Sequence, residues 1–147
     1  MGLDHARIDV WWSGRGRNWQ LMLLLAAMIQ ESDRWLGASV RLLRVVREPG
    51  EAERAQRELD RALVGAKLTA ETRVFGSDRP DQSFFEVMRR ESSEADLVVL
   101  GFTEPARDEG EVFVQRINES VRGLGTVLLV RASARFEDTK AISDQEA

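Results

Sequence analysis

The stretch Asp96-Leu97-Val98-Val99-Leu100-Gly101 decides the fold of this chain of 147 residues. Its four consecutive apolar residues, closed by a glycine, are typical of a parallel β-strand that is covered on both faces. A second run of the same kind, Thr126-Val127-Leu128-Leu129-Val130, follows a segment whose apolar residues recur at helical spacing. Because parallel strands need a crossover connection between them, these two runs predict an α/β sheet.

Working outwards, strands and helices alternate along the rest of the chain. Further strands are predicted at residues 8–12, 38–46 and 71–75, and helices at residues 19–31, 51–66, 84–88 and 112–124. This order predicts a doubly wound, mostly parallel five-stranded sheet with helices on both faces. The expected strand order is 2-1-3-4-5 or 3-2-1-4-5. We expect a single α/β domain over residues 8–133, an extension at residues 1–7 and an acidic, flexible tail at residues 134–147.

Composition excludes several classes of function. There are 21 Lys+Arg and 25 Asp+Glu, so the net charge of −4 gives no basic face for a nucleic acid. The chain contains no cysteine and one histidine, His5, which removes disulfides, thiolate catalysis and most cysteine- or histidine-based metal sites. The longest apolar run, residues 21–29, is far shorter than the roughly 20 residues that span a bilayer, so no direct membrane insertion is expected.

The loops after the first and fourth strands are the candidate ligand site, because ligands of such sheets bind beyond the carboxyl ends of the strands. After the first strand, Gly14, Arg15, Gly16 and Arg17 offer backbone N–H groups, a helix N-terminus and two cations, which suits a phosphate or another anion. Gly101 ends the fourth strand on the same edge. The spacing matches neither a dinucleotide fingerprint nor a phosphate loop, so a solvated turn with positive-φ glycines is the alternative.

No arrangement of reactive groups predicts catalysis. Asp9 and Asp96 are the only candidates for an acid–base or metal pair, but they belong to different ends of the sheet. Ser92-Ser93 has no histidine partner. We therefore expect no enzyme, no catalytic residue and no metal. Four tryptophans in the first quarter of the chain could form an aromatic ligand cage, although core packing is the favoured interpretation; they are Trp11, Trp12, Trp19 and Trp35.

The order of elements resembles that of universal stress proteins, some of which bind ATP through glycines and a Gly-Ser or Gly-Thr after the fourth strand. Here Gly101 is followed by Phe102, Thr103 and Glu104, and Asp108, Glu109 and Glu111 place acids where a triphosphate would lie. Because like charges repel, ATP or another nucleotide bound in that mode is disfavoured, and no cofactor is expected.

A second resemblance is carried by three motifs. They are the first predicted strand, Ile8-Asp9-Val10-Trp11-Trp12; the segment before the fourth strand, Ser92-Ser93-Glu94-Ala95-Asp96; and the end of the last strand, Leu128-Leu129-Val130-Arg131. Together with Arg41-Leu42-Leu43-Arg44-Val45, they resemble the cytoplasmic C-terminal domain of cation-chloride cotransporters, over most of residues 8–131.

This resemblance implies a regulatory and dimerisation domain of a membrane permease, with a universal-stress-protein-like fold and no catalysis of its own. It implies a prokaryotic version, because the phosphorylated insert of eukaryotic members is reduced to the short turn at residues 76–81. The expected partners are a second copy, through residues 112–130, and a transporter domain that tethers the chain to the inner face of the plasma membrane. The alternative is a nucleotide-sensing domain of the universal stress protein type.

Overall fold

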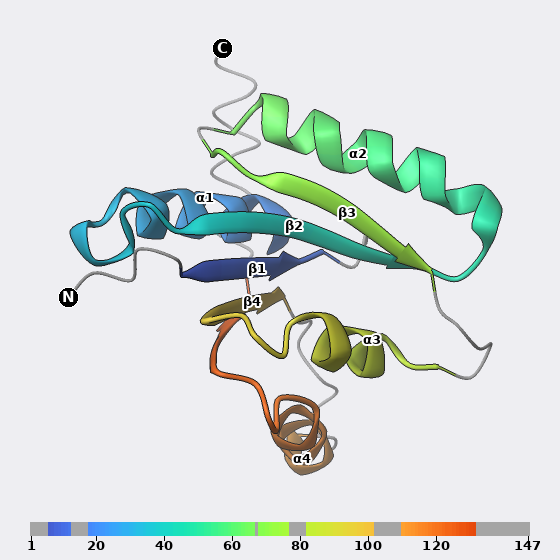
Figure 1. The fold of residues 1–147 in the computed structure, drawn as a ribbon. Helices are drawn as coiled ribbons and strands as arrows, with labels where there is room; N and C mark the ends of the chain where they lie inside the picture. The colour runs from blue at the N-terminus through green and yellow to red at the C-terminus, as the bar shows by residue number, and fades with distance from the viewer. Residues whose placement is uncertain (1–5, 13–17, 67, 77–81, 102–109, 132–147) are drawn as a thin grey trace, which may run out of the picture.

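A computed structural model of the chain describes residues 6–12, 18–66, 68–76, 82–101 and 110–131 (Figure 1). The strands are β1 (Arg7–Trp11), β2 (Ser39–Val46), β3 (Glu71–Gly76), β4 (Leu97–Gly101) and β5 (Thr126–Val130), and the helices are α1 (Asn18–Glu31), α2 (Ala52–Val64), α3 (Phe84–Glu91) and α4 (Gly110–Ser120). Two short 3-10 turns, Asp33–Trp35 and Pro49–Glu51, precede β2 and α2. Every predicted element is present, with ends that differ by a few residues.

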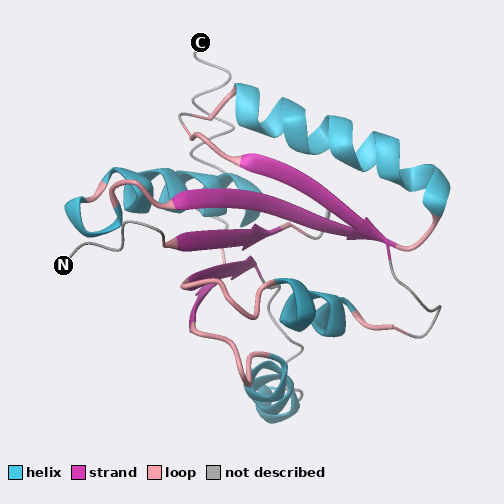
Figure 2. Ribbon diagram, in the orientation of Figure 1, coloured by secondary structure: helices cyan, strands magenta, loops and turns pink. Residues whose placement is uncertain are grey.

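The five strands form one parallel sheet in the order β3-β2-β1-β4-β5, which is one of the two predicted orders. Asp9 of β1 lies opposite Arg41 of β2 on one side and opposite Val98 of β4 on the other. Figure 2 shows the strands side by side, with helices packed against the sheet from both sides. The predicted doubly wound α/β fold is therefore confirmed.

The core consists of two clusters, one on each face of the sheet, because neighbouring side chains of a strand point to opposite faces. On one face, Ile8 and Val10 pack with Met22 and Leu23 of α1 and with Leu59 of α2. On the other face, side chains of β1, β2 and β4 pack against α3; the buried members are Trp11, Leu43, Val87, Met88, Ala95, Val98 and Leu100. α1 and α2 therefore cover one face, and α3 covers the other.

The four tryptophans divide between these faces and do not form one cage. Trp11 contacts Phe75 and Phe84, with ring centroids 5.8 and 5.6 Å away. Trp12 contacts Trp19 on the opposite face, and Trp35 packs against the same cluster. Core packing, which was the favoured interpretation, accounts for their burial.

The last helix shows the largest difference in bounds from the prediction. α4 ends at Ser120, several residues before Gly123 and Gly125. Gly123 has a φ of 86°, which glycine adopts without steric cost, and it lies in the turn that leads into β5.

Within the described part of the chain, none of the helices is long and apolar enough to cross a bilayer. The expected division into residues 1–7, 8–133 and 134–147 stays a prediction, because most of both end segments lies outside the described residues.

Candidate functional site

The candidate site lies at the carboxyl ends of β1 and β4, where the winding of the sheet reverses. The chain leaves β1 towards β2 and leaves β4 towards β5, so the connections diverge to opposite sides of this pair. In open parallel sheets, such a switch point is the place where ligands bind. The predicted candidates Gly14, Arg15, Gly16 and Arg17 lie outside the described residues, whereas Gly101 lies within them.

Gly101 brings the start of α1 against the end of β4. A Cβ atom at this position would lie 3.1 Å from Sδ of Met22 and 3.2 Å from Cβ of Asn18. A larger side chain would therefore push the first turn of α1 away from the strand. Close packing explains this glycine, and it places a helix N-terminus without an acidic residue in its first turn at the switch point.

Trp12, directly after β1, lies between an aromatic ring and a cation at the same edge. Its ring centroid is 5.3 Å from that of Trp19, and the guanidinium carbon of Arg44 lies 5.3 Å from its centroid. Only 9% of Trp12 is exposed, and its indole N–H is buried without a hydrogen-bond partner among the described residues. An unsatisfied buried donor is uncommon and is a feature that a ligand acceptor would relieve.

Arg44 is held over Trp12 by an ion pair with Glu58 of α2. Glu58 also accepts a 3.3 Å hydrogen bond from Nε of Arg54, four residues earlier in the helix. These contacts, above all the hydrogen bond from Arg44, hold the pKa of Glu58 below its ordinary value, although burial opposes the shift. Glu58 therefore keeps its charge and fixes the guanidinium of Arg44.

Asp9, a predicted candidate for acid–base or metal chemistry, is instead neutralised by an ion pair in the interior. Its carboxylate is fully buried and accepts two hydrogen bonds from Arg41, at 2.9 Å from Nε and 2.7 Å from Nη2. Nε of Arg7 lies 3.4 Å from the same carboxylate. The hydrogen bond to Asp9 is the main cause of a raised pKa at Arg41, so this guanidinium stays charged.

Ser92 completes this interior network. Its hydroxyl donates to Oδ2 of Asp9 at 2.7 Å and accepts from the indole N–H of Trp11 at 2.8 Å. Nη2 of Arg41 also donates to the carbonyl oxygen of Glu91 at 3.0 Å. The network, defined as Asp9, Trp11, Arg41 and Ser92, therefore ties β1 and β2 to the end of α3.

Asp96 and Asp9 do not converge on a shared ligand. The Asp96 carboxylate accepts a 2.8 Å hydrogen bond from the backbone N–H of Arg7, at the amino edge of the sheet. Within the described residues, no group of three or more potential metal ligands occurs. Ser93 is exposed and donates to the carbonyl oxygen of Arg90, and His5 lies outside the described part of the chain.

Sequence reasoning did not identify Arg41 as the partner of Asp9, although the signal was present. Both are charged residues between apolar neighbours in their strands, and such residues are rarely buried without a partner. In the β1–β2 pair they lie in direct register, on the same face of the sheet. Because β2 also contains Arg44, the charges alone leave two possible partners for Asp9, and the register identifies Arg41.

No known protein-family model matches the sequence, and no curated protein matches it either. Among solved structures, the chain is similar to a universal stress protein in complex with cAMP. The two share 18% sequence identity at a TM-score of 0.59, and the match covers 88% of this chain and 99% of the other. These comparisons show that the chain has a universal-stress-protein-like α/β fold.

Proposed function

We propose that this chain is a non-enzymatic sensor domain that binds a nucleotide of low charge at the switch point between β1 and β4. One observation carries the proposal: the first turn of α1 lies against Gly101 at the end of β4, beside the buried indole N–H of Trp12, for which the described residues offer no hydrogen-bond partner. In sequence, Arg15 and Arg17 immediately precede this helix. Helix N–H groups and nearby cations together favour an anionic ligand.

The charges around the switch point favour a single phosphate over a triphosphate. The segment after β4 contains Glu104, Asp108 and Glu109 in sequence, and Glu111 follows in the first turn of α4. Their repulsion grows with the charge of the ligand, whereas the loop after β1 supplies two cations in sequence, Arg15 and Arg17. A cyclic mononucleotide carries one negative charge and meets the least repulsion. The solved universal stress protein with a similar fold is in complex with cAMP, which supports the same class of ligand.

The absence of catalysis is part of the proposal. The carboxylate of Asp9 is fully buried and hydrogen-bonded to Arg41, so it lies out of reach of a ligand. Ser92 donates its hydroxyl proton to that carboxylate and lies within the core. A sensor of this kind works by binding alone, and it transmits a signal only if its two states differ in affinity for the ligand.

Isothermal titration calorimetry tests the proposal directly. We expect cAMP to bind the full chain more tightly than ATP does, and the substitutions Arg15→Ala and Arg17→Ala to weaken cAMP binding about tenfold each. Arg73→Ala on β3, whose side chain is 55% exposed and paired with Glu71, is the matched control and should leave binding unchanged. Tighter binding of ATP, or equal effects of all three substitutions, would contradict the proposal.

A second candidate function is a regulatory and dimerisation domain of a cation-chloride cotransporter-like permease, located at the inner face of the plasma membrane. The observation that favours it is the interior network, because Asp9, Trp11, Arg41 and Ser92 all belong to the segments that resemble that family. These residues, which are far apart in sequence, make up one structural unit.

Sedimentation without nucleotide distinguishes this candidate from the first. A reversible dimer that forms through residues 112–130, together with no heat from any nucleotide, would support the permease domain. The exposed apolar side chains Val112 and Val114 of α4 and Leu129 of β5 are the positions to substitute. A strictly monomeric chain that binds cAMP would support the sensor domain instead.

A further inference from the structure

A second surface lies on the outer side of α1 and α2, and it shares Trp19 with the switch point. Among the described residues, four of the seven exposed large apolar side chains lie in or next to these two helices: Leu24 and Met28 of α1, Leu36 after it, and Val64 at the end of α2. Leu24 is 50% exposed and Met28 60%. Residues 18–30 of α1 include no charged side chain, so this helix presents apolar residues to solvent as well as to the core.

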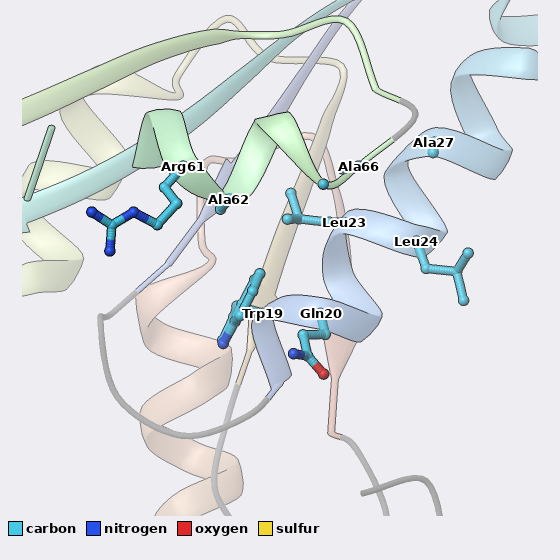
Figure 3. Close-up of a pocket in the computed structure, with 9 residues that line it drawn as sticks. Trp19, Gln20, Leu23, Leu24, Ala27, Arg61, Ala62 and Ala66 are labelled. Carbon is cyan, nitrogen blue, oxygen red and sulfur yellow. The ribbon is translucent and has the colours of Figure 1, made fainter. Parts of the chain in front are cut away.

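An open groove of about 450 Å³ runs between the two helices (Figure 3). From α1 it is lined by Trp19, Gln20, Leu23, Leu24 and Ala27, and on the other side by Arg61 and Ala62 of α2 and by Gly65 and Ala66 directly after it. Three of these four residues have no side chain beyond Cβ, so a backbone can approach closely on that side. Such a groove, with small residues on one wall and large apolar residues on the other, suits an α-helix packed at the usual interaxial distance of about 8–10 Å.

The charges around the groove differ on its two sides. The α1 side is neutral, whereas Arg61 lines the α2 side and Arg57 lies one turn earlier on the same side of that helix. Neither arginine makes an ion pair or hydrogen bond with another described residue. Two of the nearby acids are engaged: Glu58 pairs with Arg44 and Arg54, and Asp60 accepts from Gln56 and Thr72. A third, Glu53, lies one turn before Arg57, farther from the groove.

We propose that the α1–α2 groove is a docking site for an acidic amphipathic helix of another protein. The apolar side of that helix would pack on Leu23, Leu24 and Ala62, and its acidic flank would face Arg57 and Arg61. The groove lies on the outer side of two helices that cover the sheet, so this inference does not depend on a ligand at the switch point. It gives a regulatory domain a surface through which to contact its target.

The test uses the full chain and a dye-labelled synthetic helix of about 15 residues, with leucines at helical spacing and glutamates along one flank. Fluorescence polarisation should show binding with a Kd of about 10–100 µM. A peptide with lysine in place of every glutamate should bind about tenfold more weakly. Arg61→Glu should reverse that preference. Equal affinity for the acidic and basic peptides would overturn the proposal.

Two glycine substitutions give a matched pair for blocking the groove. Gly65 lines it and Gly50 lies before α2, and a Cβ atom added at either position meets nothing within 4 Å. Neither glycine has a positive φ, so both substitutions are compatible with the fold. Gly65→Leu should weaken acidic-peptide binding at least about tenfold, while Gly50→Leu should not change it.

Other occupants would be recognised in the same experiments, and each would overturn the proposal. If Gly65→Leu, but not Gly50→Leu, converts a dimer to a monomer in sedimentation, the groove belongs to a second copy. If deletion of residues 132–147 raises the affinity for the peptide, the groove is the place of this chain's own C-terminal segment. If neither change occurs and the charge preference holds, the proposal stands.

Discussion

Replacing Arg41 with methionine should be among the most destabilising single changes in the chain. Arg41→Met keeps much of the side-chain volume but removes the guanidinium that pairs with Asp9 through hydrogen bonds of 2.9 and 2.7 Å. The Asp9 carboxylate is fully buried, and the Arg41 side chain is only 12% exposed. The variant therefore leaves a charge in the core without its main partner.

Removing one partner of a buried ion pair costs about 3–5 kcal/mol. Arg7 retains part of the pairing, because its Nε lies 3.4 Å from the carboxylate of Asp9, so we expect the lower end, about 3 kcal/mol. Typical domains are stable by about 5–15 kcal/mol, so this loss is a large share of the total. With a urea m-value of about 1.5 kcal/mol/M, the midpoint should fall by about 2 M.

The assay is urea unfolding followed by circular dichroism, with Arg73→Met as the control. Arg73 is 55% exposed and pairs with Glu71 at the surface, so its replacement should change stability by less than about 0.5 kcal/mol. The double variant Asp9→Val with Arg41→Met should be more stable than Arg41→Met alone, because it removes the buried charge as well. A loss below about 1 kcal/mol for Arg41→Met, or strict additivity in the double variant, would refute the assignment.

Three further predictions concern other parts of the fold. Ser92→Ala should cost about 1–3 kcal/mol, since it leaves the buried indole N–H of Trp11 without an acceptor, while Ser93→Ala should be nearly neutral; thermal unfolding compares the two. Glu58→Gln should cost about 0.5–1 kcal/mol near pH 7. Because the pKa of Glu58 is lowered in the folded state, the contribution of its charge to stability is present above the unfolded pKa and is lost as the pH falls through the folded pKa. The difference in urea midpoint between the unsubstituted chain and Glu58→Gln should therefore shrink in acid. Gly123→Ala should lower the Tm because of the φ of 86°, whereas Gly65→Ala should raise it by a few degrees; a raised Tm for Gly123→Ala or a lowered one for Gly65→Ala would contradict this explanation.

The fold was predictable because the apolar residues of the strands form recognisable patterns in the sequence. Val98 and Val99 lie in a run that is apolar at every position, as a strand buried on both faces requires. The order of the strands was predicted only to two alternatives, which differ in whether β3 lies beside β1 or beside β2. The hydrophobic pattern does not distinguish them, because the choice depends on long-range pairing; in the structure β3 pairs with β2, with Val74 opposite Arg44.

The candidate site was less predictable than the fold, for a physical reason. The loop residues Gly14 to Arg17 carry the sequence signal for an anion, but they follow no pattern that fixes their geometry. The neighbours of Trp12 come from two other elements: Trp19 is the second residue of α1, and Arg44 lies in β2. A sequence alone does not show that these side chains meet, because the contact with Trp19 depends on the course of the chain between β1 and α1 and the contact with Arg44 on the pairing of β1 with β2.

The interior network separates what specifies the fold from what could carry the function. Asp9 and Ser92 are fully buried, and their polar atoms are matched to each other, to Arg41 and to Trp11. Side chains in that position hold β1, β2 and α3 in place but cannot touch a ligand or a partner. Related domains could therefore share these residues and still differ in function. Function must depend on the surfaces that the network supports, namely the switch point and the α1–α2 groove, and these two surfaces are where substitutions should alter binding without unfolding the domain.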